Sequence, residues 1–125
     1  MNVEEVYGFC KSLPHAEETF PFDQINLVFK IGGKMFALLP LDKPRLIIVK
    51  CDPQLAIELR ERYTGIEAAW HFNKKHWNQI DLTSDVPVAV IEQSIRHSYD
   101  LVHAKLPRAI RQSLNDISTT HSDDV

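Results

Sequence analysis

The sequence predicts a single α+β domain in which an antiparallel sheet carries its helices on one side. Three observations lead to this fold class. The chain of 125 residues has the usual length of one domain. Apolar residues alternate with polar ones in several short segments, which is typical of strands, and they recur at helical spacing in other segments. Along the chain, these segments follow the order α-β-β-β-α-β-β-α.

The first element is predicted to be an amphipathic helix over residues 3–12. Asn2 can cap its N-terminus, and Glu5 stands where it completes a capping box. The buried stripe of this helix would consist of Val3, Val6, Cys10 and Leu13. Pro14 ends the helix. The next segment, residues 16–23, has two aromatic residues around a proline and is interpreted as an irregular or edge strand.

The strongest local prediction is a β-hairpin around Gly32-Gly33, because two glycines can adopt the positive φ angles of a type I′ turn. The strand before the turn alternates apolar residues, at Ile25, Leu27, Phe29 and Ile31. The return strand covers residues 34–39. Pairing Ile31 with Lys34 sets the register. It would place two apolar pairs on one face, Phe29 with Phe36 and Leu27 with Leu38.

A further strand, a helix and a second hairpin are expected to follow. Residues 45–50 form a β-branched apolar run that suits a central strand. A helix then begins at Asp52, a favourable N-cap, and ends at Gly65. The second hairpin is predicted over residues 66–72 and 76–82.

The last predicted helix begins at Ser84 or Asp85 and has one continuous apolar face. Pro107 ends or kinks it, and residues 109–114 can continue as a short helix. The acidic remainder, rich in Ser, Thr and Asp, is expected to be disordered. These boundaries predict an α+β domain at residues 1–114 and a tail at residues 115–125.

The location of the protein is predicted from its cysteines and its apolar runs. Cys10 and Cys51 form neither a metal-ligand pair nor a disulfide framework, so we expect two core residues in a reducing compartment. No signal peptide is expected, because Glu4 and Glu5 lie in the first turn. The apolar runs are too short for a membrane span. We predict a cytoplasmic protein with no membrane partner.

Catalytic and metal-binding patterns are weak in this sequence. His71 and His76 flank a predicted turn, but neither a cysteine pair nor a carboxylate stands at ligand spacing. Gly32-Gly33 lacks the flanking residues of a phosphate-binding loop. No serine stands in a nucleophile elbow. We therefore predict no enzyme, no cofactor and no metal site.

Basic residues at the two hairpins point to a nucleic-acid interface. The net charge is −3, yet residues 27–51 contain five basic residues and one acidic residue. Lysines at a hairpin tip can contact the phosphate backbone, and aromatic residues beside them can stack on bases. The predicted contacts are Lys30, Lys34, Lys74, Lys75 and His76, with Arg45 and Lys43 as secondary candidates. Alternatively, the lysines only solvate the turns while the core is filled by Trp70, Phe72 and Trp77.

Five segments of the chain match a known pattern: Phe20-Pro21-Phe22, Val28 to Ala37, Lys50 to Pro53, Asn73 to Asn78, and Ser98 to Val102. In combination they resemble the MmcQ/YjbR family of small bacterial proteins, over residues 3–107 of this sequence. The stretch Asn-Lys-Lys-His-Trp-Asn is the most specific of them. The resemblance implies a fold like that of CyaY or the secretion chaperones, and a double-wing DNA-binding role.

Two alternative functions would use other parts of the chain. A frataxin-like role would have acidic residues bind iron, namely Glu4, Glu5, Glu17, Glu18 and Asp23. A chaperone-like role would hold a peptide or protein on an exposed apolar sheet face or edge, with Trp70 and Trp77 exposed in a groove. We expect the chain to be a monomer.

Overall fold

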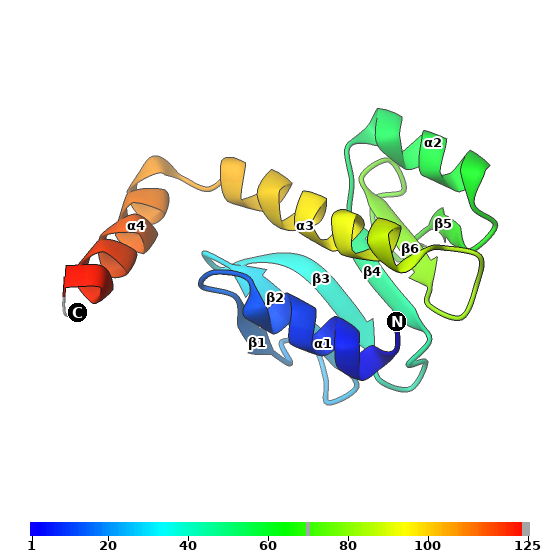
Figure 1. The fold of residues 1–125 in the computed structure, drawn as a ribbon, viewed down its shortest axis with the longest axis horizontal. Coiled ribbons are helices and arrows are strands. Elements are labelled where there is room, and N and C mark those ends of the chain that lie inside the picture. Colours follow the sequence, from blue (N-terminus) through cyan, green and yellow to red (C-terminus); the bar gives the residue numbers. More distant parts are fainter. Residues whose placement is uncertain (70, 124–125) are drawn as a thin grey trace.

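The computed structural model describes residues 1–69 and 71–123, and beyond Asp116 it describes only the course of the backbone. The described elements are α1 (Val3–Ser12), β1 (Glu17–Thr19), β2 (Asn26–Ile31), β3 (Lys34–Pro40), β4 (Leu46–Lys50), α2 (Pro53–Arg62), β5 (Ile66–Ala68), β6 (Trp77–Asp81), α3 (Val88–Ala104) and α4 (Arg108–Asp123). The strands form one antiparallel sheet in the order β1-β2-β3-β4-β6-β5 (Figure 1). The predicted α+β fold and element order are confirmed, with β1 as the edge strand.

The main core lies between the sheet and helices α1 and α3, which cross the same face of the sheet (Figure 1). Helix α1 begins at the predicted capping box, in which the Asn2 side chain accepts from the Glu5 backbone N–H. The helices contribute Val6 and Cys10 from α1 and Ile91, Ile95 and Val102 from α3. Because these side chains are buried against alternate residues of the central strands, the helices are fixed on one side of the sheet.

A second, smaller apolar cluster lies on the opposite face of the sheet. Its buried members are Val28, Leu38, Ile48 and Ala69, with Met35, Phe72 and Trp77 packed against them. Strand β5 already ends at Ala68 and β6 begins at Trp77, so the described residues 69 and 71–76 lie outside the strands, and the long hairpin arm predicted from the sequence is not formed by them. Trp77 is therefore half-buried and belongs to this cluster. Trp70 lies outside the described residues.

The predicted β2–β3 hairpin forms, but its register differs from the prediction. Ile31 pairs with Lys34 as expected, and the turn glycines have φ angles of 57° and 82°. Further from the turn, Phe29 pairs with Ala37 and Leu27 with Leu39, so the predicted pairs with Phe36 and Leu38 were wrong by one residue. The register shifts between Phe29 and Lys30. A bulge of this kind adds one residue to a strand, which sequence alternation does not reveal.

The chain after Pro107 is helical over a longer range than the sequence indicated. The prediction was a short helix over residues 109–114 and a disordered tail from Asn115, whereas α4 continues to Asp123. The segment contains neither glycine nor proline after Pro107, so nothing in it interrupts a helix. Figure 1 shows α4 leaving the body of the molecule beyond the end of α3.

Among the described residues, no helix combines the length and the apolar content that crossing a bilayer requires.

Candidate functional site

Several lysines meet at one end of the sheet, because antiparallel pairing brings the β2–β3 turn, the end of β4 and the start of β6 to the same side. Ala37 pairs with Val49, and Lys50 pairs with Trp77. The chain just after α3 reaches this end as well, since a Cβ at Gly32 would lie 2.6 Å from Cδ1 of Leu106. We call this region the basic end and define it by Lys30, Lys34, Lys50, Lys74, Lys75 and Lys105.

The two secondary candidates lie at the opposite end of the sheet. Arg45 precedes β4, and its Nη1 donates to Oδ2 of Asp81 at 2.9 Å. Lys43 lies in the loop between β3 and β4, at the same opposite end. The structure therefore does not bring these residues to the predicted phosphate contacts, because the length of β4 separates them from the turn. We remove Arg45 and Lys43 from the candidate site.

Two carboxylates lie close to the basic end. Glu17 is paired with Lys30 across β1 and β2, so the charge of Lys30 has an acidic neighbour. Asp52 caps α2, and its carboxylate accepts from the backbone N–H groups of Gln54 and Leu55, each at 3.1 Å.

The loop that carries Lys74 and Lys75 is held by residue Arg60 of α2. Nε of Arg60 donates to Oδ1 of the buried Asn78 at 2.7 Å, and its Nη2 donates to the carbonyl oxygens of Lys74 and Trp77. Because one guanidinium bridges three acceptors, α2 fixes the position of the loop. The role of Arg60 was not predicted from the sequence, since its partners follow it by 14 to 18 positions in the chain.

Hydrogen bonds within the loop tighten it further. The Asn73 side chain accepts from the backbone N–H of Lys75 at 3.0 Å, and its carbonyl accepts from those of His76 and Trp77, each at 3.0 Å. The carbonyl of His76 accepts from the Cys51 N–H at 2.7 Å. His76 thus joins the loop to the end of β4 through its backbone, and its imidazole is half-buried.

A buried serine of α3 joins β3 and β4 where their pairing stops. The paired positions of these strands are Ala37 with Val49 and Leu38 with Ile48. The Ser98 hydroxyl donates to the Phe36 carbonyl at 2.6 Å and accepts from the Lys50 N–H at 2.8 Å. Ser98 is 0% exposed. Its hydroxyl therefore satisfies two backbone groups that the sheet leaves unpaired.

A pocket of about 360 Å³ opens at the basic end. Its lining residues are Lys34, Met35, Lys50, Trp77, Val102 and Lys105. None of these described lining residues carries a carboxylate, and half of them are lysines. Lys50 and Lys105 were not among the contacts predicted from the sequence. The position of Lys50 could have been predicted, because it is the charged residue at the end of an apolar strand. The position of Lys105 could not, because it depends on where α3 packs.

The Lys50 ammonium has a pKa below its ordinary value. Partial burial is the main cause, and the charge of Lys105 adds to it. This lowered pKa makes the free energy of unfolding depend on pH. Because the folded pKa is the lower one, the native state binds fewer protons than the unfolded state between the two values. The contribution of Lys50 to stability therefore grows as the pH rises through the folded pKa.

Replacing Lys105 with methionine is expected to raise the pKa of Lys50, because the like charge is removed while the burial remains. The pKa should approach its ordinary value without reaching it, since burial is the larger cause. Titration of the lysine side-chain NMR signals measures this shift. Lys43→Met, at the opposite end of the sheet, is the matched control, and an unmoved Lys50 pKa in Lys105→Met would contradict the proximity of the two ammonium groups.

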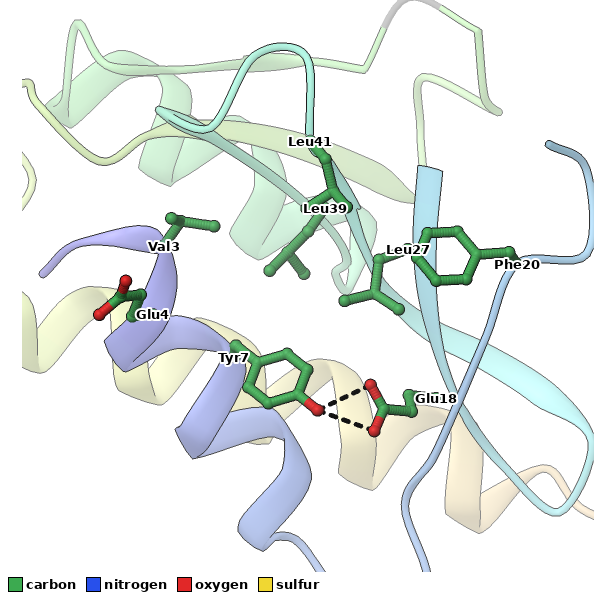
Figure 2. Close-up of a pocket in the computed structure, with 8 residues that line it drawn as sticks. All are labelled: Val3, Glu4, Tyr7, Glu18, Phe20, Leu27, Leu39 and Leu41. Carbon is green, nitrogen blue, oxygen red and sulfur yellow. Dashed lines mark hydrogen bonds between the residues drawn. The ribbon is translucent and has the colours of Figure 1, made fainter. Parts of the chain in front are cut away.

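Beside α1, Glu18 forms a small cluster with Tyr7 and Lys11. Both carboxylate oxygens of Glu18 lie 2.7 Å from the Tyr7 hydroxyl (Figure 2). Lys11 Nζ lies 3.3 Å from Glu18. Asp23 accepts from the backbone N–H groups of Ile25 and Asn26. The carboxylates of Glu18 and Asp23 thus accept hydrogen bonds from donors of the protein itself. Among the described residues, no three His, Cys, Asp or Glu side chains come together as metal ligands would.

An apolar pocket of about 400 Å³ lies next to this cluster. Figure 2 shows its walls, formed by Val3, Tyr7, Phe20, Leu27, Leu39 and Leu41, with Glu4 and Glu18 at the rim. The nearby chain exposes large apolar side chains, with Phe22 70% and Phe20 47% exposed. This surface differs in chemistry from the basic end.

Comparison with known families and proteins gives one consistent result. A family model described as YjbR matches residues 11–101. The Escherichia coli O157:H7 protein YbdF, described as uncharacterized, is 36% identical over 91 residues, which is 72% of this chain and 75% of that protein. YjbR of Escherichia coli K12, also described as uncharacterized, is 26% identical over 115 residues, or 91% and 98% of the two chains.

Solved structures with the same fold agree with this match. The crystal structure of the Deinococcus radiodurans protein DR2400 superposes with a TM-score of 0.84 at 38% identity, and the match covers 90% of this chain and 87% of that one. A crystal structure of a Pseudomonas syringae protein has a TM-score of 0.69 at 25% identity, over 82% of this chain and 99% of that one.

Proposed function

The chain belongs to the YjbR family, and from this premise we propose that it is a monomeric, non-enzymatic module that binds DNA through its basic end. One observation carries the proposal: lysines from the β2–β3 turn, the β5–β6 loop, β4 and α3 gather at one end of the sheet. The chain as a whole is acidic, with a net charge of −3. These lysines offer positive charge on one region of an acidic chain, and a phosphate backbone can approach them there.

The chemistry of this surface favours contact with phosphates rather than with base edges. Lys34, Lys74 and Lys75 are exposed, and lysine acts on phosphate as a mobile point charge. The backbone beneath them is held by Arg60 and Ser98. We expect affinity that depends steeply on salt and little on DNA sequence.

Replacing Lys74 and Lys75 together with glutamine is expected to weaken duplex DNA binding by roughly tenfold at low salt, because two phosphate contacts are lost. The loss should be similar for unrelated sequences. The slope of log K against log salt should become shallower by about 2. Fluorescence anisotropy titrations of a labelled duplex at several salt concentrations measure both quantities.

The control for this variant is Lys43→Gln, which removes a lysine at the opposite end of the sheet and is expected to leave the salt slope unchanged. Equal affinity and slope in the unchanged protein and the double variant would remove the loop from the interface. If the double variant and Lys43→Gln lose the same affinity for each lysine replaced, net charge alone determines binding, and the basic end does not.

The apolar pocket beside α1 favours a second candidate, the binding of a peptide or protein segment. Phe20 lines this pocket and is 47% exposed, and β1 is a three-residue strand at one edge of the sheet. An extended apolar peptide could pair with such an edge and place a side chain in the pocket. Thermal stabilisation by apolar peptides that Leu41→Asn abolishes, with no DNA binding at low salt, would favour this function over the first, since Leu41 lines the pocket and is 43% exposed.

A further inference from the structure

The pocket at the basic end combines two kinds of wall. Lys34, Lys50 and Lys105 supply ammonium groups, while Trp77, with Met35 and Val102, supplies an aromatic and apolar surface. This combination is complementary to a ligand that carries both a negative group and a flat ring. A volume of about 360 Å³ lies at the small end of the usual range for ligand pockets.

Among the described residues, the lining of this pocket contains no carboxylate to balance its ammonium groups. Lys50 is half-buried, and within the part of the chain that the structure describes no carboxylate forms an ion pair with Lys50 or Lys105. Two like charges are thus held near each other. The pKa of Lys50 is lowered as a result, by burial first and by the charge of Lys105 second. An anion between them would remove this repulsion.

The aromatic wall is held rigidly. The Trp77 ring packs against Phe72 with the ring centroids 5.5 Å apart. Its backbone N–H donates to Asn73 at 3.0 Å, and its carbonyl accepts from the Ala69 N–H at 3.1 Å. Since Lys50 is the cross-strand partner of Trp77, an amine and an indole are presented side by side. A preorganised pair of this kind can bind a base by stacking while the amine binds its phosphate.

We propose that this pocket binds one nucleotide, with its phosphate between Lys50 and Lys105 and its base against Trp77. The proposal rests on the DNA-binding function and deepens it: beyond phosphate contacts with a duplex, the basic end takes up one unpaired nucleotide. The nucleotide can come from a single-stranded segment or from the free pool. Both sources present the same phosphate and base, so the pocket chemistry is the same for either.

Calorimetric titration of the full chain with deoxyadenosine monophosphate tests the pocket directly. Deoxyadenosine, which lacks the phosphate, and 2-deoxyribose 5-phosphate, which lacks the base, are the two partial ligands. We expect each partial ligand to bind about tenfold more weakly or worse, because one wall of the pocket is left unused. A single-stranded oligonucleotide that competes with the monophosphate, when a blunt duplex does not, identifies the strand as a source.

Lys50→Gln and Lys105→Gln are each expected to weaken monophosphate binding by about tenfold, because each removes a charge-assisted contact. Lys43→Gln serves as the matched control and should bind as the unchanged protein does. Lys50→Arg retains the charge and should keep most of the affinity. A thermal melt shows whether Lys50→Gln is folded. If it is not, Lys50→Arg and Lys105→Gln still test the pocket.

The same proteins titrated with a blunt duplex separate this proposal from the proposed function. Salt-dependent duplex binding together with no saturable binding of the monophosphate or of single strands would overturn the nucleotide pocket and leave the DNA-binding function standing. Monophosphate binding that Lys50→Gln and Lys105→Gln leave unchanged would overturn it equally. Monophosphate binding without duplex binding would support the pocket and refute the function on duplex DNA.

Discussion

Replacing Ser98 with alanine is expected to lower the free energy of unfolding by about 3 kcal/mol, since two buried backbone groups lose their partner at once. The Ser98 hydroxyl accepts from Lys50 N–H and donates to the Phe36 carbonyl. In the alanine variant this N–H and this carbonyl stay buried between β3 and β4 without another strand to pair with. Water cannot easily replace the hydroxyl, because Ser98 is fully buried.

Urea denaturation followed by circular dichroism measures this loss. The matched control is Ser94→Ala, one turn earlier on the same face of α3. Ser94 is also buried, at 9% exposure. Within the described part of the chain, the bonds from α3 to β3 and β4 are made by the Ser98 hydroxyl and not by that of Ser94. A Ser98→Ala variant no less stable than Ser94→Ala would contradict the bridging role of the hydroxyl.

The loss of the Ser98 bridge should also reach the ligand site. Lys50 lies on the strand that Ser98 holds, and the pocket of the basic end lies between that strand and the start of β3. We therefore expect the affinity for nucleotides to fall in Ser98→Ala even though no charged residue is changed. Stability and binding are thus linked through one hydroxyl at the point where the two strands separate.

Local chemistry allowed most of the fold to be predicted from the sequence. The capping box at Asn2 and the glycine pair at residues 32–33 are determined by neighbours in the chain, and both formed as expected. The register beyond the turn was not predictable in this way. The bulge between Phe29 and Lys30 leaves both Phe36 and Ala37 in the main core, and an alternation rule cannot anticipate two consecutive inward residues.

The candidate site was predictable only in part, for the same reason. Lys34, Lys74 and Lys75 stand at turns that the sequence marks, so their exposure could be foreseen. Their meeting with Lys50 and Lys105 depends on the strand order, in which β6 lies next to β4, and on the position of α3. Arg45 shows the opposite case, because its basic character was evident but its pairing with Asp81 at the far end was not.

Replacing Arg60 with methionine is expected to lower the free energy of unfolding by about 3 kcal/mol and to loosen the loop that carries Lys74 and Lys75. Methionine keeps much of the length of the side chain but none of its donors. The buried side chain of Asn78 then loses the partner of its Oδ1, and the carbonyls of Lys74 and Trp77 lose their link to α2. A more mobile loop places its lysines less often in the geometry that binds phosphate, so DNA affinity should fall as well.

Arg62→Met provides the matched control, since it removes the same charge from the same helix. Arg62 is exposed, and its guanidinium lies 5.6 Å from the Tyr63 ring rather than on the loop. Hydrogen exchange over residues 73–77 reports the loosening, and duplex titration of both variants separates it from the effect of charge. If both variants lose the same affinity and the exchange rates of the loop stay unchanged, α2 does not position the loop. A larger loss in Arg60→Met would mean that binding depends on how the lysines are held, and not only on how many there are.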